Sequence, residues 1–516
     1  MRTILHRQFL ACAGVGLLLI CAPLQAAPSA IGLFDGQSDV GRVTPPGTAS
    51  YDPASDSYTL TSAGINTWYR ADAFHFLWKQ MSGDVSLTAD IAFPPTAYSH
   101  APNPHRKAML MIRQTLDAGS VYADAALHGV GLTALQYRRE SGADTQDIEM
   151  NVAAPQTLRL VKRGDTLTMY LSMHGEALHQ VGASTKLHFD APFYVGLGVT
   201  SHDIDTTDKI VFSHVRLETP PPETQPLVAY STLQTLQLAD QARIATVILT
   251  KPGIFESPNW TPDGKALLIN ENGSFRKIPL LDPPAGGTPV PFDTGEAHGC
   301  WGEHGFSPDG KWLAVSCSSP GQKGPNVYIV PAEGGASRQL THQPVSFFHG
   351  WSPDGKTIVF TSIRDGHEDI YTIPAAGGTE TRLTHSGIND AAEYTPDGTY
   401  LYFNSDRSGL MQIWRMHPDG SALEQITADE HNNWYPHISP DGKSMVFISY
   451  AKADTGLHPP MKDVRLRLME LDSGLIRTLV HLTGGQGTID SPCWAPDSQH
   501  IAFVSNQMLP ASDAGQ

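Results

Sequence analysis

Six copies of one turn motif, Pro-Asp-Gly or a near copy, lie between residues 260 and 498 and constrain the fold of this chain more than any other feature. The residue two positions before each proline is aromatic or apolar. The prolines stand at positions 262, 308, 353, 396, 440 and 496, which gives steps of 46, 45, 43, 44 and 56 residues. A period in the forties, with several short strand-like runs in each unit, is typical of β-propeller blades. The repeat therefore predicts an all-β, six-bladed propeller over residues 227–508.

One repeat shows how each blade is expected to form. The inner strand ends at the Pro-Asp-Gly turn, and 356–362 and 369–373 follow as the second and third strands. Residues 376–378 turn the chain, and 382–384 begin the outer edge. Proline presets φ in such turns and glycine accepts a positive φ, so six aspartates in one turn position are structural rather than catalytic.

The sixth blade needs strands from elsewhere in the chain. Its own sequence ends at 503–505, and two strand-like runs without a blade, 232–238 and 243–248, precede the first motif. We expect these runs to pair with the last blade, because closure removes the open edges of the ring.

The first half of the chain, residues 27–218, has almost no helical periodicity. A stiff proline-rich linker, 219–226, separates it from the propeller. Short alternating or apolar runs predict a β-sandwich of the jelly-roll type; they are 85–93, 108–113, 131–138, 158–163, 167–171 and 193–199.

Both halves resemble known families. The recurring register of Ser-Pro-Asp-Gly-Lys, Ile-Tyr, Gly-Gly and Leu-Thr resembles the TolB-type six-bladed propeller over 227–508. The runs 78–86, 105–114 and 122–129 resemble the concanavalin A-like lectin/glucanase domain, and this resemblance extends over about 31–217. The first resemblance implies a periplasmic role in protein interaction. The second implies a two-sheet sandwich whose concave face often holds sugar.

The two ends are expected to lie outside the fold. Arg2, Arg7, an apolar run over 9–24 and a small residue at Ala26 are typical of a secretory signal, residues 1–26, although a membrane anchor is the alternative. Residues 509–516 are expected to form a disordered tail. No other run is long and apolar enough to span a membrane, so the predicted location is periplasmic or secreted.

The formal net charge of −17 limits the possible partners. It argues against nucleic acid and anionic membrane surfaces, which require basic surfaces. Neutral glycans, peptides and envelope proteins remain possible.

Cys300 and Cys317 flank the second turn motif almost symmetrically. Antiparallel pairing would place them nearly opposite each other, so a disulfide is plausible in an oxidising compartment, although cross-strand neighbours do not always reach bridging geometry. Cys493 is expected to be a buried apolar residue.

Residues three to five positions before the prolines are expected to face the central channel. They are Glu303, His304, His349, Glu393 and His437. His304, His349 and His437 could hold Mn, Zn or Ca with nearby acids, whereas a polar channel lined with hydrogen-bonded histidines is the alternative. Oligogalacturonate lyases hold a histidine-bound metal in a related propeller, which leaves open a metal-assisted polysaccharide lyase or a glycoside hydrolase.

Two further sets of residues could bind a ligand. Asn433, Trp434 and Gln486 lie in loops that enter inner strands and could form an aromatic platform with amide donors, or could simply pack blade against blade. On the predicted sandwich, polar strand residues could line a concave face or face solvent; they are Arg113, Asp124, His128, Gln136 and Arg138.

The chain lacks a Gly-x-Ser-x-Gly elbow and a His-Glu-x-x-His motif, which disfavours two common hydrolase mechanisms. We therefore predict an exported binding protein for a glycan or cell-envelope component. A carbohydrate-active enzyme with its site in the channel is the alternative.

Overall fold

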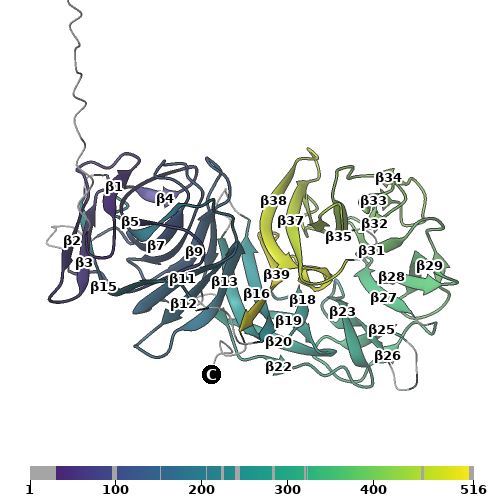
Figure 1. Cartoon of the computed structure of the whole chain (residues 1–516). Coiled ribbons are helices and arrows are strands. Elements are labelled where there is room, and N and C mark those ends of the chain that lie inside the picture. The colour runs from purple at the N-terminus through teal and green to yellow at the C-terminus, as the bar shows by residue number, and fades with distance from the viewer. Residues whose placement is uncertain are drawn as a thin grey trace, which may run out of the picture.

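The structure is a computed structural model of the whole chain (Figure 1). It describes residues 31–510 apart from short gaps at 96–101, 151–152, 205, 222–225, 239–243, 282–284, 319–320, 322–323, 344 and 455–457. The predicted signal, residues 222–225 of the predicted linker and residues 511–516 of the predicted tail lie outside the described residues. In the described part the fold is all-β, with a single short 3-10 helix, η1 (Gln486–Thr488). None of its helices is long and apolar enough to span a bilayer.

Two sheets form the N-terminal region. The first has the order β1-β5-β14-β7-β8-β9-β10, with β4 paired to β5. Its strands are β1 (Gly36–Val40), β4 (Asn66–Trp68), β5 (Ala71–Met81), β7 (Lys107–Arg113), β8 (Tyr122–His128), β9 (Thr133–Arg138), β10 (Gln146–Glu149) and β14 (Phe193–Thr200). The second has the order β13-β12-β11-β6-β15-β3-β2. Its strands are β2 (Thr48–Asp52), β3 (Ser57–Ser62), β6 (Val85–Ala92), β11 (Thr157–Arg163), β12 (Thr166–Ser172), β13 (His179–Lys186) and β15 (Asp208–Glu218).

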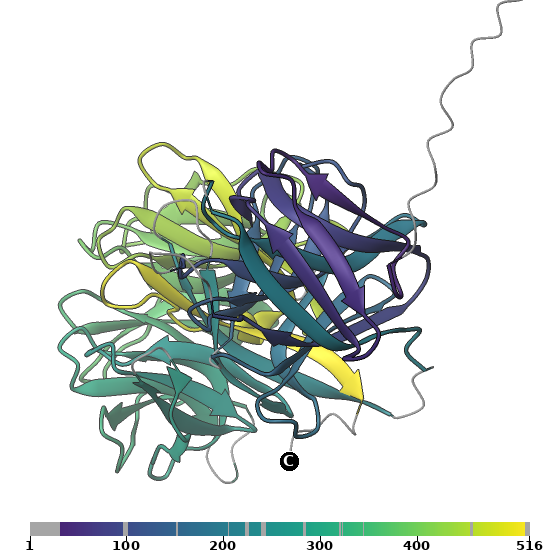
Figure 2. The same ribbon diagram turned by 90° about the vertical axis from the view of Figure 1, so that its left-hand side faces the viewer.

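The core of this region lies between the two sheets. Alternate residues of the first sheet, such as Leu110 and Leu135, pack in one cluster with Leu87 and Leu160 of the second. The opposite face of the first sheet instead carries polar side chains and a smaller apolar cluster that includes Phe74 and Met109. Figure 2 shows the purple N-terminal strands in front of the repeat region.

Five blades of the propeller are separate sheets, each numbered from its inner strand outward. The first contains β18 (Phe255–Trp260), β19 (Ala266–Glu271), β20 (Ser274–Leu281), β21 (Ala285–Gly286) and β22 (Val290–Pro291). The second contains β23 (His298–Phe306), β24 (Trp312–Ser318), β25 (Asn326–Pro331) and β26 (Arg338–Gln339). The third contains β27 (Ser346–Trp351), β28 (Thr357–Arg364), β29 (His367–Pro374) and β30 (Thr381–Arg382). The fourth contains β31 (Asn389–Tyr394), β32 (Leu401–Ser405), β33 (Gln412–Met416) and β34 (Glu424–Gln425). The fifth contains β35 (Asn432–Ile438), β36 (Ser444–Tyr450), β37 (Lys462–Glu470) and β38 (Ile476–Gly484).

The prediction of six blades requires a correction, because the sixth repeat does not form a sheet of its own. Its strand β39 (His500–Pro510) pairs with β16 (Leu227–Gln237), and β16 pairs with β17 (Ile244–Pro252). β17 then runs parallel to β10, so these three strands continue the first N-terminal sheet to eleven strands. The expected pairing of the two orphan runs with the last repeat is present. Leu509 and Pro510, which the sequence analysis predicts to be part of the disordered tail, belong instead to β39.

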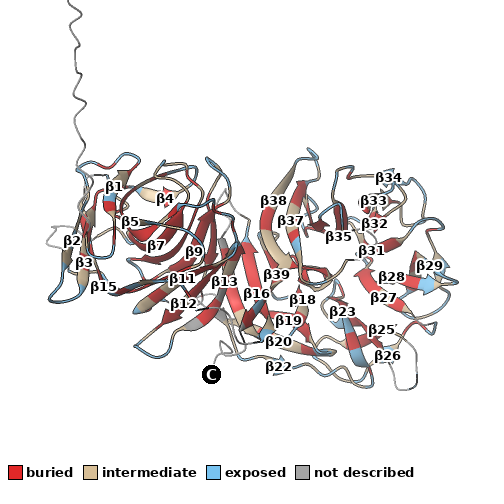
Figure 3. Ribbon diagram, viewed as in Figure 1, coloured by how far each residue is buried: buried red, intermediate tan, exposed pale blue. Residues whose placement is uncertain are grey.

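Burial follows this arrangement. Figure 3 shows buried residues along the sheets of both regions and along β16, which lies between them. The aspartates of the Pro-Asp-Gly motifs stabilise the turns, as expected. In five repeats the Asp accepts a hydrogen bond from the Ser or Thr hydroxyl two residues earlier, as Asp309 does from Ser307 at 2.7 Å.

Tryptophans two residues before the prolines connect neighbouring repeats. The indole N–H groups of Trp260, Trp351 and Trp494 donate to the carbonyls of Cys493, Gly305 and His437, at 3.1, 2.9 and 2.9 Å. Each acceptor lies three residues before the proline of the preceding repeat. The bond from Trp260 to Cys493 joins the first repeat to the last.

Candidate functional site

The inner strands carry a bulge at equivalent positions. Ser257, Ala391 and Tyr435, five residues before their prolines, have φ values of 62°, 55° and 55°. The register to the second strand shifts at each of them. A non-glycine residue in the left-handed region carries local strain, which native structures retain mainly at sites where geometry matters. The bulge redirects the side chains on either side of it.

Four carboxylates gather around these bulges in the centre of the propeller, and we call them the acidic cluster: Glu256, Glu303, Asp390 and Asp490. They come from four repeats. Glu303 and Asp490 are almost fully buried. Within the described part of the chain, Glu303 Oε2 and Asp490 Oδ1 have no hydrogen-bond partner. Buried polar atoms are normally paired, so these oxygens are acceptors available to water or to a ligand.

Burial and mutual repulsion shift the pKa values of the cluster. Burial, with smaller contributions from Asp390 and Glu256, raises the pKa of Glu303 to about 7. Burial and the charges of Glu303 and Glu256 raise the pKa of Asp490 well above its usual range. Asp390 is different: its burial is outweighed by the His349 imidazole, whose Nε2 lies 2.9 Å from Asp390 Oδ1, and its pKa falls to about 2.

Two segments cover the cluster. Gln486 of η1 donates to Glu303 Oε1 at 3.2 Å. The adjacent Gly487 leaves no room for a side chain, because a Cβ there would lie 2.4 Å from Glu256. His458 comes from the insertion in the fifth and longest repeat, between β36 and β37, and its ring packs edge-on against Trp434 at 4.5 Å between centroids. Burial lowers the pKa of His458.

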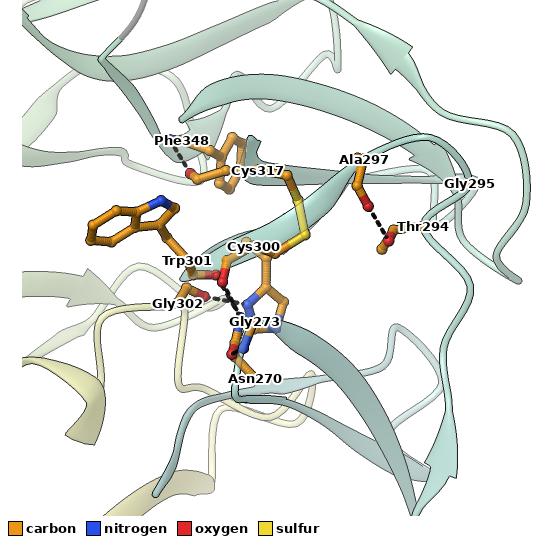
Figure 4. The surroundings of a disulfide bond; sticks show 12 residues. Asn270, Gly273, Thr294, Gly295, Ala297, Cys300, Trp301, Gly302, Cys317 and Phe348 are labelled. Atoms are coloured by element: carbon orange, nitrogen blue, oxygen red, sulfur yellow. Dashed lines mark hydrogen bonds between the residues drawn. A yellow bond between two sulfur atoms is a disulfide. The ribbon is translucent and has the colours of Figure 1, made fainter. Parts of the chain in front are cut away.

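An exposed tryptophan, Trp301, follows the disulfide-bonded Cys300 directly in the chain (Figure 4). The side chain of Trp301 is 47% exposed and contacts the ring of Phe347 edge-on at 5.6 Å. Asn270 holds this segment by donating to the carbonyls of Cys300 and Trp301, at 3.0 and 2.9 Å. Cys300 and Cys317 are bonded through their sulfur atoms.

The next residue, Gly302, links this segment to the acidic cluster. A Cβ at Gly302 would lie 2.2 Å from Asp490 Oδ2 and 2.2 Å from Ser257 Oγ. Close approach of the Trp301 segment to the carboxylates therefore requires glycine at this position.

The three histidines proposed as metal ligands do not come together. Among the described residues, no group of three or more His, Cys, Asp or Glu side chains has the arrangement of a metal site. His304 is buried against Phe275, with Nδ1 2.6 Å from the carbonyl of Gly302, and burial lowers its pKa to about 4. His437 lies between Glu393, at 2.7 Å, and the carbonyl of Ile489. These three histidines therefore do not form the metal site that the metal-assisted lyase requires.

The aromatic platform expected at Trp434 is also different in the structure. Trp434 is buried beneath His458 rather than open to a ligand. Asn433 is fully buried, donates to Gln412 and Asp429, and accepts from Ser449, so it connects the fifth blade to the fourth. Of this set, only Gln486 contacts the acidic cluster.

A second site lies on the outer, polar face of the first N-terminal sheet. This N-terminal pocket has a volume of about 740 Å3. Trp68 and the exposed Tyr69 form an aromatic side, and the buried part includes Lys107, His128, Gln136 and Asp147. His128 and Gln136, which the sequence suggested as residues that could line a binding face, both line this pocket.

Arg113 and Arg138 have a different role. Both guanidinium groups are fully buried and bind the carboxylate of Asp72, at 3.3 and 2.8 Å. Arg138 also donates to the carbonyls of Tyr69 and Ala143. The two arginines therefore hold the loops around the pocket instead of contacting a ligand.

Lys107, which the sequence did not single out, is the central charge of this pocket. Its Nζ donates to Gln136 Oε1 at 3.0 Å and lies 5.2 Å from the centre of the Trp68 ring. Burial lowers the pKa of Lys107 to about 8. Burial also raises the pKa of Asp147 to about 8 and that of Asp124 well above its usual range, and both Asp124 oxygens lack partners within the described residues.

Comparison with known proteins supports the propeller that the repeat predicts. The model of the TolB beta propeller domain matches residues 292–389 and 345–509. An uncharacterized protein of Agrobacterium fabrum is 44% identical over 265 residues, which are 51% of this chain and 89% of the relative. A TolB-like protein structure from Agrobacterium tumefaciens is 42% identical with a TM-score of 0.51, covering 55% of this chain and 99% of that one. The TolB structure of Acinetobacter baumannii is 21% identical with a TM-score of 0.38, covering 50% and 64%.

The fold and the repeat thus define a β-propeller protein of the Pro-Asp-Gly type. The chain belongs to the TolB-like β-propeller family. The jelly-roll and concanavalin A-like assignment of the N-terminal region stays a prediction.

Proposed function

We propose that this protein is an exported binding protein whose propeller takes up a positively charged segment of a partner protein at the acidic cluster. The observation that supports this most is a pair of buried oxygens, Glu303 Oε2 and Asp490 Oδ1, that have no hydrogen-bond partner in the part of the chain that the structure describes. A guanidinium or ammonium group supplies hydrogen-bond donors to these two oxygens. It also supplies a positive charge that balances the carboxylates.

The surroundings fit the same ligand. Trp301, one residue before the Gly302 that approaches Asp490, packs against Phe347, and a cation is attracted to the face of such rings. TolB-like propellers mediate protein interactions, which agrees with a partner of this kind. The disulfide between Cys300 and Cys317 and the signal-like residues 1–26 support export to the periplasm.

The test compares two peptides whose termini are blocked and uncharged, acetyl-Gly-Arg-Gly-amide and its citrulline analogue, by NMR titration of the full chain. The arginine peptide should bind at least tenfold more tightly, because citrulline has the same shape without the charge. Binding should strengthen from pH 6 to pH 8 as Glu303, with a pKa of about 7, loses its proton.

Two variants locate the binding. Glu256→Gln and Trp301→Ala should each weaken it several-fold. Glu333→Gln, at a side chain that is 90% exposed, and Trp312→Ala, at another half-exposed tryptophan, are the matched controls. Equal affinity for the two peptides, or equal loss in the controls, would show that the acidic cluster is not the site.

A second candidate function, binding of a glycan, has its own support in the N-terminal pocket. Trp68 offers a flat aromatic face, and the buried Oδ1 of Asp147 has no hydrogen-bond partner among the described residues. Sugar hydroxyls are donors, and aromatic rings pack against sugar faces. A glycan array with the full chain tests this: Trp68→Ala should abolish the signal and Trp312→Ala should preserve it. An array without a hit would exclude the glycan.

A further inference from the structure

A third pocket, with a volume of about 370 Å3, lies where the two regions of the molecule meet. We call it the junction pocket. Its floor is the eleven-stranded sheet at β10, β17, β16 and β39, and its two sides are β13 of the N-terminal region and β38 of the last separate blade. In Figure 1 these strands lie together in the middle of the molecule.

Hydrogen bonds fix the two sides of this pocket relative to each other. Arg139 donates to the carbonyl of His481 at 3.0 Å, and Gln146 donates to the carbonyl of Leu479 at 3.3 Å. Both acceptors are backbone groups of β38, whereas both donors come from the N-terminal region. The pocket therefore exists before any ligand arrives, which lowers the entropic cost of binding.

The lining is mainly apolar. Tyr137 and Ile148 contribute from the N-terminal region, and Leu479, Leu482 and Leu509 contribute from the propeller. All except Leu482 are buried. Such walls favour a ligand that is mostly hydrocarbon.

One polar side chain in the floor has no partner. Gln507 of β39 is 9% exposed, and within the described residues neither its amide nitrogen nor its amide oxygen makes a hydrogen bond. It lines the pocket together with Leu509, two residues further along the same face of the strand. An unpaired buried amide costs free energy, and a primary amide, whose C=O and one N–H lie side by side, satisfies its donor and its acceptor at once.

We propose that the junction pocket binds a small primary acyl amide, with a linear apolar chain and one terminal amide group that pairs with both polar atoms of Gln507. The size agrees, since a cavity of about 150 Å3 holds benzene, so 370 Å3 accommodates roughly 15 non-hydrogen atoms. This site is separate from the acidic cluster, and its ligand is independent of the function proposed above.

The test uses two probes of equal size, nonanamide and methyl octanoate, titrated calorimetrically into the full chain. Only the amide carries an N–H donor. We expect the amide to bind roughly tenfold more tightly than the ester, because the ester leaves the oxygen of Gln507 unpaired. Gln507→Leu should reduce this preference to less than twofold while the ester still binds.

Filling the pocket should abolish binding of both probes. Leu482→Trp does this from β38, and Ser184→Trp does it from β13 if the first variant fails to fold. Leu475→Trp, at an exposed leucine just before β38, is the matched control and should leave the affinities unchanged. No binding of the amide at 1 mM, equal binding of amide and ester, or an equal loss in the Leu475 variant would overturn the proposal.

Discussion

Two neighbouring residues, Glu303 and His304, are both buried in β23, yet burial shifts their pKa values in opposite directions. Burial disfavours the charged form of either side chain, so it raises the pKa of the carboxyl to about 7 and lowers that of the imidazole to about 4. Because the two groups ionise oppositely, they destabilise the fold at opposite ends of the pH range.

Replacing His304 by Gln should remove part of the acid sensitivity of the fold. Between pH 6.5 and 4 the unfolded chain takes up a proton at His304 that the folded protein does not, so wild-type stability falls as pH falls. The difference in the free energy of unfolding between wild type and variant should change by about 3 kcal/mol across this window, as measured by urea denaturation. The same comparison with His385→Gln, at an exposed histidine, should show no such change.

Replacing Glu303 by Gln should change the stability of the fold at the alkaline end of the pH range. The folded protein holds the proton up to pH 7, whereas the unfolded chain releases it near 4.5, so this residue lowers stability as pH rises through that window. Relative to wild type, Glu303→Gln should gain about 3 kcal/mol between pH 4.5 and pH 8. Thermal melts at both pH values measure this. A constant offset at all pH values would mean that the buried carboxyl does not titrate.

Counting from the prolines predicted some site residues and missed others for a physical reason. Glu303 was found because it lies five residues before its proline, in the bulge itself. Glu256 was missed, because it lies one position earlier, where the bulge changes which side chains turn inward. His458 could not be found by counting, since an insertion folds back over the centre of the propeller.

At the scale of the element, the residues that define the repeat hold the blades to one another. The alternation of short strands predicted nearly every blade strand, because the Pro-Asp-Gly turn marks the end of each inner strand. The sequence could not show that the last repeat joins the N-terminal sheet. That contact depends on three residue pairs between β10 and β17, which are almost 100 residues apart.

Trp260→Phe should weaken the contact between the first and last repeats. Phenylalanine fills most of the same space but cannot donate to the carbonyl of Cys493, so the loss should be about 1–2 kcal/mol in the free energy of unfolding. Urea denaturation at an unchanged m-value measures it. Trp312→Phe, at a tryptophan that is 45% exposed, should cost less than 0.5 kcal/mol by the usual range for surface changes. Equal costs would contradict a role for the indole bond.

At the scale of the whole molecule, the eleven-stranded sheet makes one structure of the two regions. β39 and β16 share eleven register pairs, so the end of the chain is fixed at the junction. β17 is then covered by β10 on its other edge. The relative from Agrobacterium tumefaciens matches this chain over 99% of its own length but only 55% of ours, so a TolB-like propeller exists as a protein of its own.

A fragment of residues 226–510 should therefore fold but associate with itself. Without β10, the edge of β17 from Ile244 to Thr246 has unpaired backbone groups, and such an edge is a template for pairing with another chain. We expect a cooperative thermal transition together with a sedimentation coefficient that rises with concentration, while the full chain shows no such rise. Thr246→Lys should suppress the association, because a charge on an edge strand opposes pairing. A fragment that sediments independently of concentration would show that β10 is not needed to protect this edge.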